Sequence, residues 1–355
     1  MTVLAVSTLL HPDRFFIDGQ WTTPSTGSMI DVIDSTTEEV FLRVAEATPD
    51  DMAHAISAAR NAFDHGPWPQ MSHAERASYL IAFSEELRRR ADDISAVWPR
   101  QSGVLHSHAA MMVEGAAGDL DSYAALADTF PFVEQVAPTS GGDYGLVVRE
   151  PVGVVGAIIP WNGPIGLIVH KVAPALLAGC TVVLKSAPEA PTEGYIVAEI
   201  AEKIGLPAGV LNVVTADREV SEMLVRDPRI DKITFTGSTA AGRRIASICG
   251  DRVARYTLEL GGKSAAIVLD DADIASAADV LANAECLNSG QVCSSLTRIV
   301  VTQSRHDEMV AALAEIFGGI RVGDPFDPAS QMVHWSQRGT RERIEGFVAA
   351  ALADG

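Results

Sequence analysis

From Pro151 onwards the sequence alternates strictly between short apolar runs and helical segments, and this alternation limits the possible fold more than any other feature. The apolar runs have the length and composition of strands, and they cover residues 153–159, 181–184, 210–214, 232–236 and 256–260. Strands separated by helices in this way form parallel βαβ units and a doubly wound sheet. We therefore predict an α/β fold with a Rossmann-like parallel sheet.

Distinctive residues stand at or just after the ends of four of these five strands: Trp161 and Asn162, Lys185, Gly237 and Ser238, and Leu260. The carboxyl ends of parallel strands meet at one edge of the sheet, and ligands of such sheets bind beyond that edge. We expect these residues to form one ligand site there.

Residues 288–295, with the sequence NSGQVCSS, form a polar turn between an alanine-rich helical pattern and the apolar run 298–302. A cysteine on such a turn can be exposed enough to react, provided that backbone amides, a helix N-terminus or a nearby base favours the thiolate. A lone cysteine is more often a small buried hydrophobe. On this stretch alone, both interpretations of Cys293 are open.

Three further stretches overturn the buried interpretation of the cysteine: PWNGP at residues 160–164, FTGSTAAG at 235–242 and LELGGK at 258–263. Together with the cysteine turn, and in this order, they closely resemble the aldehyde dehydrogenase superfamily. The likeness runs from Phe15 to the end of the chain. The resemblance implies oxidation of an aldehyde to a carboxylic acid with NAD(P) through a thioester on Cys293.

Four residues receive catalytic roles from this resemblance. Cys293 is the nucleophile, and the amide of Asn162 donates a hydrogen bond to the oxyanion that forms from the substrate carbonyl. Glu259 activates the hydrolytic water, and Lys171 takes part in proton relay. Because Glu259 lies inside an apolar strand, we expect its carboxylate to be partly desolvated and so a better base near neutral pH. The ordinary alternatives are an asparagine that satisfies turn backbone, a glutamate paired with Arg or Lys, and an exposed helix lysine.

The segment from Gly237 to Gly242 joins a strand to a helix. Ser238 can cap this helix while its free backbone amides face a diphosphate. The spacing nearly matches a nucleoside-triphosphate loop, but Arg243 and Arg244 replace the lysine and hydroxyl of that motif, and we exclude it. Taken alone, the junction is about as compatible with a plain tight turn.

The cofactor is predicted to be NAD, with NADP possible. In the resembled family a lysine at the position of Lys185 holds the adenosine ribose, and a glutamate shortly after it selects the unphosphorylated cofactor. Here Pro188 occupies the usual position of that acid, and Glu189 follows one step later. The resemblance also assigns Pro160, Trp161, Gly242 and Leu260 to the cofactor site.

The resemblance divides the chain into three parts. Residues 1–130 and 150–259 form the NAD(P)-binding domain, and residues 260–355 form a second α/β domain, the catalytic one. Residues 131–149, with a Gly-Gly pair between two extended pieces, read locally as a hairpin. In the family such a hairpin bridges subunits of a homodimer or homotetramer, a state left open for this shortened chain. The catalytic domain is expected to be incomplete, because family members are longer and carry a second glutamate motif after the cysteine.

Charge and cysteine content exclude several other classes of protein. The 27 basic and 46 acidic residues give a net charge of −19, which argues against nucleic-acid or anionic-membrane partners. The four cysteines form no C-x-x-C pair and no zinc spacing, and we assign no metal. The first ten residues do not read as a signal peptide, and no run has the length of a membrane span. We expect a cytoplasmic protein whose partner is a small aldehyde.

Two alternatives to a hydrolytic aldehyde dehydrogenase are kept. The shortened chain could be a dinucleotide-binding remnant, or half of a split enzyme. It could also be an acylating enzyme that passes the thioester to coenzyme A, although such an enzyme has no need of a water-activating Glu259.

Overall fold

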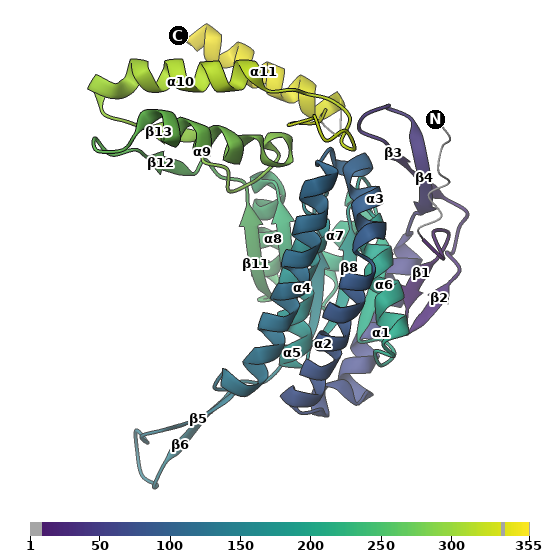
Figure 1. The fold of residues 1–355 in the computed structure, drawn as a ribbon. Coiled ribbons are helices and arrows are strands. Elements are labelled where there is room, and N and C mark those ends of the chain that lie inside the picture. The colour runs from purple at the N-terminus through teal and green to yellow at the C-terminus, as the bar shows by residue number, and fades with distance from the viewer. Residues whose placement is uncertain (1–8, 335–337, 355) are drawn as a thin grey trace.

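The computed structural model describes residues 9–334 and 338–354. At its centre lies a seven-stranded sheet in the order β11-β10-β7-β8-β9-β1-β2 (Figure 1). Its parallel strands are β7 (Val154–Ile158), β8 (Thr181–Ser186), β9 (Leu211–Thr215), β10 (Lys232–Gly237) and β11 (Arg255–Leu260). The antiparallel hairpin of β1 (Phe15–Ile17) and β2 (Gln20–Thr22) extends the sheet beyond β9. The predicted doubly wound α/β fold is confirmed.

Helices cover both faces of this sheet. One face carries the helices α5 (Pro164–Ala178) and α6 (Thr192–Lys203), and against these pack α2 (His73–Arg89), α3 (Ala91–Ser102) and α4 (His106–Thr129). The other face carries α1 (Pro49–His65), α7 (Arg218–Arg226) and α8 (Thr239–Asp251). Successive apolar residues of one strand, such as Val154 and Val155, belong to opposite cores. This burial on both faces explains why the strands read as continuous apolar runs.

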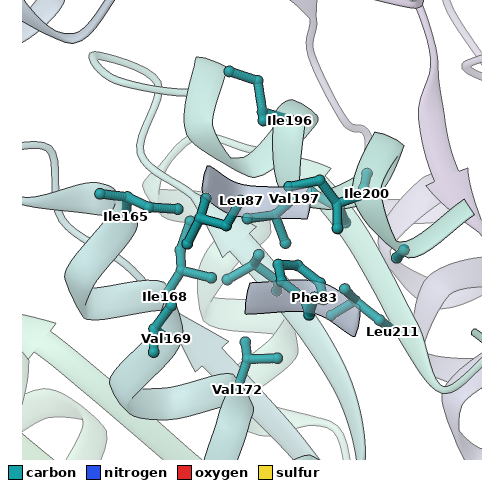
Figure 2. Close-up of a cluster of buried hydrophobic side chains, with 14 of the residues drawn as sticks. Phe83, Leu87, Ile165, Ile168, Val169, Val172, Ile196, Val197, Ile200 and Leu211 are labelled. Atoms are coloured by element: carbon teal, nitrogen blue, oxygen red, sulfur yellow. The ribbon is translucent and has the colours of Figure 1, made fainter. Parts of the chain in front are cut away.

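The core of the first layer holds α5 in place. In Figure 2 the side chains of Phe83 and Leu87 from α2 lie among those of α5 and α6, which include Ile165, Ile168, Val169, Val172, Ile196, Val197 and Ile200. Since α5 begins at Pro164, two residues after Asn162, this packing also positions the turn that carries Asn162.

The sequence near the N-terminus predicts several local features: Asp18-Gly19 is typical of a hairpin turn, Thr48 and Ser72 of helix N-caps, and the alanine-rich run 103–127 of a helix. The turn and both caps are confirmed. Asp18 and Gly19 have φ angles of +53° and +73° in the turn between β1 and β2. Thr48 and Ser72 cap α1 and α2, each through a capping box. The helix expected over 103–127 differs in its start: Gly103, with φ of +66°, is the C-cap of α3, which ends at Ser102, and α4 begins at His106. A two-stranded sheet of β3 (Met29–Ile33) and β4 (Val40–Ala45) also lies in this region.

A smaller α/β part follows β11. Its parallel strands β12 (Ala265–Ile267) and β13 (Arg298–Val300) pack with α9 (Ile274–Cys286) and α10 (His306–Gly319), and α11 (Arg338–Asp354) follows (Figure 1). Its core is small and includes Ala278, Leu281 and Met309. Large apolar side chains of this part are exposed, at 71% for Ile267, 65% for Leu269 and 66% for Val280. The predicted second α/β part is therefore present, with two strands and an apolar face open to solvent.

The strands β5 (Val133–Val136) and β6 (Gly145–Val148) form the antiparallel hairpin expected over 131–149. It projects away from the rest of the chain (Figure 1), and its turn contains Gly141 and Gly142, both with positive φ. A role in bridging subunits stays a prediction. Within the described residues, no helix is both long and apolar enough to cross a membrane.

Candidate active site

A cleft of about 530 Å³ opens at the edge of the main sheet where the sequence places a ligand site. It lies beyond the carboxyl ends of β7, β8 and β10 and is flanked by α7 and α8. Six of the eight predicted cofactor residues line it: Pro160, Trp161, Lys185, Glu189, Gly237 and Ser238. Parallel strand ends thus bring together residues that are up to 78 positions apart in the sequence.

Lys185 brings a buried cation to this cleft. Its side chain stands at the end of β8, and burial lowers its pKa from about 10.5 to about 8, while the carboxylates of Glu189 and Asp217 act in the opposite direction. Desolvation disfavours a charge that has no close partner. An anion bound in the cleft would supply such a partner.

The residues of the cleft fit a dinucleotide. Ser238 caps α8 by accepting a hydrogen bond from the backbone N–H of Ala241 (3.3 Å), so the helix N-terminus faces the cleft as predicted. The hydroxyl of Thr236 also lines the cleft, is buried, and has no hydrogen-bond partner among the described residues. A buried hydroxyl without a partner is costly, and a ligand with polar groups would satisfy it.

Two of the predicted cofactor residues lie elsewhere. Gly242 and Leu260 are outside the cleft lining and pack against each other: a Cβ placed on Gly242 would lie 2.7 Å from Cδ2 of Leu260. Gly242 therefore permits the close approach of α8 to β11 and does not face the cleft. The glycine spacing of the motif reflects packing between helix and strand.

The cysteine turn has an unusual backbone. Asn288, Ser289 and Gly290 are consecutive left-handed residues, with φ of +49°, +56° and +77°. This region costs non-glycine residues about 1–3 kcal/mol each and is held only by surrounding contacts. Cys293 follows on the same turn and is exposed, as the reactive interpretation requires, whereas Cys180 and Cys249 are buried.

Asn162 is bonded directly to the cysteine turn. Its Nδ2 donates a hydrogen bond to the backbone carbonyl of Gln291 (2.8 Å), and Asn288 Nδ2 donates to the backbone carbonyl of Asn162 (2.7 Å). The third stretch meets the same turn, since a Cβ placed on Gly262 would lie 3.6 Å from the carbonyl oxygen of Cys293. Three stretches that are far apart in the sequence therefore converge at Cys293.

The expectation that Glu259 is partly desolvated is wrong, because its side chain is exposed. Glu259 lies on β11, the edge strand of the sheet, and pairs with Thr236 of β10 on one side only. In the described residues no further strand covers the outer edge of β11, and its neighbour Tyr256 is 46% exposed.

Lys171 is buried in α5, which excludes the alternative of an exposed helix lysine. Burial lowers its pKa, and the carboxylate of Glu259 acts in the opposite direction. The charge of one predicted proton-transfer group therefore acts on the other. Within the described part of the chain, no group of three or more His, Cys, Asp or Glu side chains could hold a metal ion.

Sequence reasoning missed three residues of this site: Asn288, Gln291 and Ser102. Gln291 Nε2 donates to the carbonyl of Ser102 at the end of α3 (3.1 Å), and the Ser102 hydroxyl donates to the carbonyl of Trp161 (2.6 Å). The only available signal was the Asn-Ser-Gly sequence, since asparagine tolerates the left-handed backbone of turns. The contact with α3 joins residues nearly 190 positions apart and has no local signature.

This doubly wound sheet, with its cleft at the carboxyl edge, belongs to the dinucleotide-binding class of folds. A family model described as "Aldehyde dehydrogenase family" matches residues 21–355. The chain belongs to the aldehyde dehydrogenase family, and the resemblance drawn from the sequence is confirmed.

Individual relatives also match nearly the whole of this chain, which covers about 70% of their own length. A geranial dehydrogenase of Castellaniella defragrans is 39% identical over 337 residues, which are 94% of this chain and 70% of the relative. An aldehyde dehydrogenase of Mycobacterium tuberculosis complexed with NAD+ superposes with a TM-score of 0.93 at 41% identity, covering 97% of this chain and 71% of the other. A Pseudomonas syringae enzyme complexed with NAD+ and octanal gives a TM-score of 0.91 at 34% identity, covering 97% and 70%.

Proposed function

We propose that this chain oxidises an aldehyde to a carboxylic acid through a covalent thioester on Cys293. The observation that carries the proposal is the hydrogen bond between the Asn162 amide and the turn of the exposed Cys293. It joins an oxyanion donor to a nucleophile beside a dinucleotide cleft. Membership of the aldehyde dehydrogenase family supports the same chemistry.

The first step is addition of the Cys293 thiolate to the carbonyl carbon of the aldehyde, which forms a C–S bond and an oxyanion. An amide NH₂ group has two N–H donors, and Asn162 uses one on Gln291. The second N–H and the backbone N–H of Cys293 can both donate hydrogen bonds to the oxyanion. Loss of one such donor typically slows acyl-transfer reactions by about a hundredfold to a thousandfold.

Bound NAD would supply the acceptor for the hydride that leaves the substrate carbon as the thioester forms. Glu259 then removes a proton from water, whose oxygen attacks the thioester carbonyl. The C–S bond breaks, the acid leaves, and the thiolate of Cys293 is restored. Buried Lys171, whose protonated form the carboxylate of Glu259 favours, accepts or returns the proton of this step.

Two acids near Lys185 support NAD as the cofactor, with NADP as the alternative. Lys185, the predicted partner of the ribose, lies near two carboxylates, Glu189 and Asp217. A ribose phosphate placed beside Lys185 would also meet these acids, which repel it. We assign cofactor contacts to Pro160, Trp161, Lys185, Glu189, Gly237 and Ser238, and supporting packing to Gly242 and Leu260.

We further propose a division of the chain into a dinucleotide-binding domain (1–130 and 150–259), a bridging hairpin (131–149) and a catalytic domain (260–355). The separate small core of the last part supports this division. The four free cysteines fit a reducing compartment such as the cytoplasm.

The proposal is tested by recording nicotinamide absorbance while purified protein is mixed with NAD and a panel of aliphatic and aromatic aldehydes. Turnover should require Cys293 and persist in Cys286→Ala, a matched removal of a less exposed thiol. Turnover that survives Cys293→Ala would contradict the proposal. Dependence on added coenzyme A would instead identify an acylating enzyme.

A second candidate is a chain that binds dinucleotide but turns over aldehyde only when a further polypeptide covers its catalytic part. The exposure of Glu259 and of Ile267, Leu269 and Val280 favours it, because a general base and large apolar side chains normally lie in covered sites. Thermal stabilisation by NAD without turnover would support this candidate. Turnover by the isolated chain would exclude it.

A further inference from the structure

Three side-chain amides form a closed ring of hydrogen bonds around the candidate oxyanion site. Asn162 Nδ2 donates to the Gln291 carbonyl (2.8 Å), Gln291 Nε2 donates to the Asn288 carbonyl (3.1 Å), and Asn288 Nδ2 donates to the Asn162 carbonyl (2.7 Å). Each side chain thus bonds to the backbone of the next residue in the ring. Two of these bonds tie the Asn162 turn to the cysteine turn, and the third, from Gln291 to Asn288, braces the cysteine turn itself.

We infer that Asn288 and Gln291 are positioning residues, which orient the Asn162 amide toward the carbonyl attacked by Cys293. The inference rests on the function proposed above and assigns roles that this function does not itself require. Neither residue needs to touch the substrate for this role.

The orientation of the Asn162 amide follows from its acceptor. A backbone carbonyl can only accept, so the NH₂ end of Asn162, and not its oxygen, must face Gln291. The carbonyl of Gln291 lies two residues before Cys293 and also receives a weaker bond from Asn288 Nδ2 (3.4 Å). The bond to the Gln291 carbonyl therefore fixes the orientation of the amide group, and with it the direction of the remaining N–H of Asn162.

The ring is anchored to a rigid element. Gln291 Nε2 also donates to the carbonyl of Ser102, one of the last carbonyls of α3, which have no partner within the helix (3.1 Å). The Ser102 hydroxyl donates to the carbonyl of Trp161, beside Asn162 (2.6 Å). The end of α3 thus contacts both turns and sets the distance between them.

The ring is specific for amides. The oxygens Asn288 Oδ1 and Gln291 Oε1 are buried and have no hydrogen-bond partner in the described residues. Only the NH₂ ends of these two side chains are used, and all four of their acceptors are backbone carbonyls. A carboxylate at either position would place oxygen against oxygen.

Two variants each remove one side-chain amide of the ring and leave the backbone conformation accessible. Gln291→Met keeps the length of the side chain and removes its amide. Asn288→Gly removes the amide and tolerates the left-handed backbone at φ of +49°. The control is Asn283→Ala, which removes an exposed asparagine of α9 that bonds only to the carbonyl of Asp279 in its own helix.

In steady-state kinetics with NAD and aldehyde, we expect each variant to lower kcat about tenfold to a hundredfold, as misplacement of a reacting group does. The KM for NAD and the rate of Cys293 alkylation by iodoacetamide should stay within about twofold, since neither depends on an oxyanion donor. In an Asn162→Ala background the same substitutions should change kcat by less than about threefold. If the substitutions lowered kcat in that background as much as they do in the unsubstituted protein, the inference would be overturned.

A measurement without turnover separates this inference from the proposed function. The Asn162 side-chain amide, assigned by its loss in Asn162→Asp, should show a ¹⁵N order parameter near that of rigid backbone, about 0.85. It should fall below about 0.6 in Gln291→Met and Asn288→Gly, and stay high in Asn283→Ala. A mobile amide in the unsubstituted protein would overturn the inference, whereas a rigid amide without any turnover would contradict only the proposed function.

Discussion

The side chain of Leu260 packs directly onto Gly242, where a Cβ would lie 2.7 Å from its Cδ2 atom and 2.9 Å from its Cδ1 atom. This contact joins α8, whose N-terminus faces the dinucleotide cleft, to the end of β11, which carries Glu259. The helix beside the cleft and the strand of the candidate catalytic base therefore pack against each other at Gly242.

Gly242→Ala should leave the protein about 1 kcal/mol less stable than a Gly→Ala change elsewhere in the same helix, since the added methyl group must displace the end of the Leu260 side chain. The free energy of unfolding from urea denaturation measures this effect. The control is Gly250→Ala in the same helix, where an added Cβ meets no atom within 4 Å. That substitution should stabilise by up to about 1 kcal/mol through helix propensity. Equal effects of the two changes would show that the contact with Leu260 is not tight.

Binding of NAD above pH 8 should be coupled to proton uptake at Lys185. Burial lowers the pKa of this lysine to about 8, and a bound diphosphate raises it again because the anion favours the protonated form. The Kd for NAD should therefore rise by up to about tenfold between about pH 7 and about pH 9. Isothermal titration calorimetry in buffers of different ionisation enthalpy measures the protons taken up.

Lys185→Met should abolish this proton uptake, whereas Lys203→Met, which removes an exposed lysine at the end of α6, should leave it unchanged. An affinity that does not vary with pH in the unsubstituted protein would rule out a neutralised Lys185 in the cleft.

Glu193 should make the protein less stable as the pH rises toward neutrality. It is fully buried at the start of α6, bonded to Gln101 and Thr192, and burial raises its pKa from about 4.5 to about 7. The folded state then binds the proton more tightly than the unfolded chain. The stabilisation is complete below about pH 4.5 and is lost as the pH rises through 7, by a few kcal/mol at most.

Glu193→Gln keeps an oxygen that accepts from Gln101 and Thr192 but cannot ionise. It should raise the free energy of unfolding at pH 8 and remove its fall between pH 5 and pH 7. Glu315→Gln, at an exposed position of α10, should leave the profile unchanged. A pH profile that is the same in the Glu193 variant and the unsubstituted protein would show that Glu193 does not titrate in this range.

The sequence was sufficient for the elements that depend on local pattern. The five apolar runs predicted the five parallel strands, and Asp18-Gly19, Thr48 and Ser72 predicted a turn and two helix starts, because these features are set by residues close together. The edge of the sheet that holds the cleft also followed from pattern, since parallel strands place their carboxyl ends together.

Features that depend on contacts between distant residues could not be predicted. The exposure of Glu259 depends on which strand forms the edge of the sheet, and an apolar strand sequence is the same at an edge and in the interior. The bond from Gln291 to Ser102 depends on where α3 ends, at Ser102, and on how this helix end packs against the cysteine turn. Gly242 followed a cofactor motif, yet its role in packing became visible only with Leu260 in place.

The central claim is that Cys293 carries the acyl group during aldehyde oxidation, and the most direct test is the intact mass of Glu259→Gln after acid quenching with NAD and aldehyde. Without the base that activates water, we expect one acyl group on Cys293 and a burst of about one reduced nicotinamide per chain. Cys293→Ala in the same background should show neither. A burst of reduced nicotinamide without an adduct on Cys293 would contradict the account.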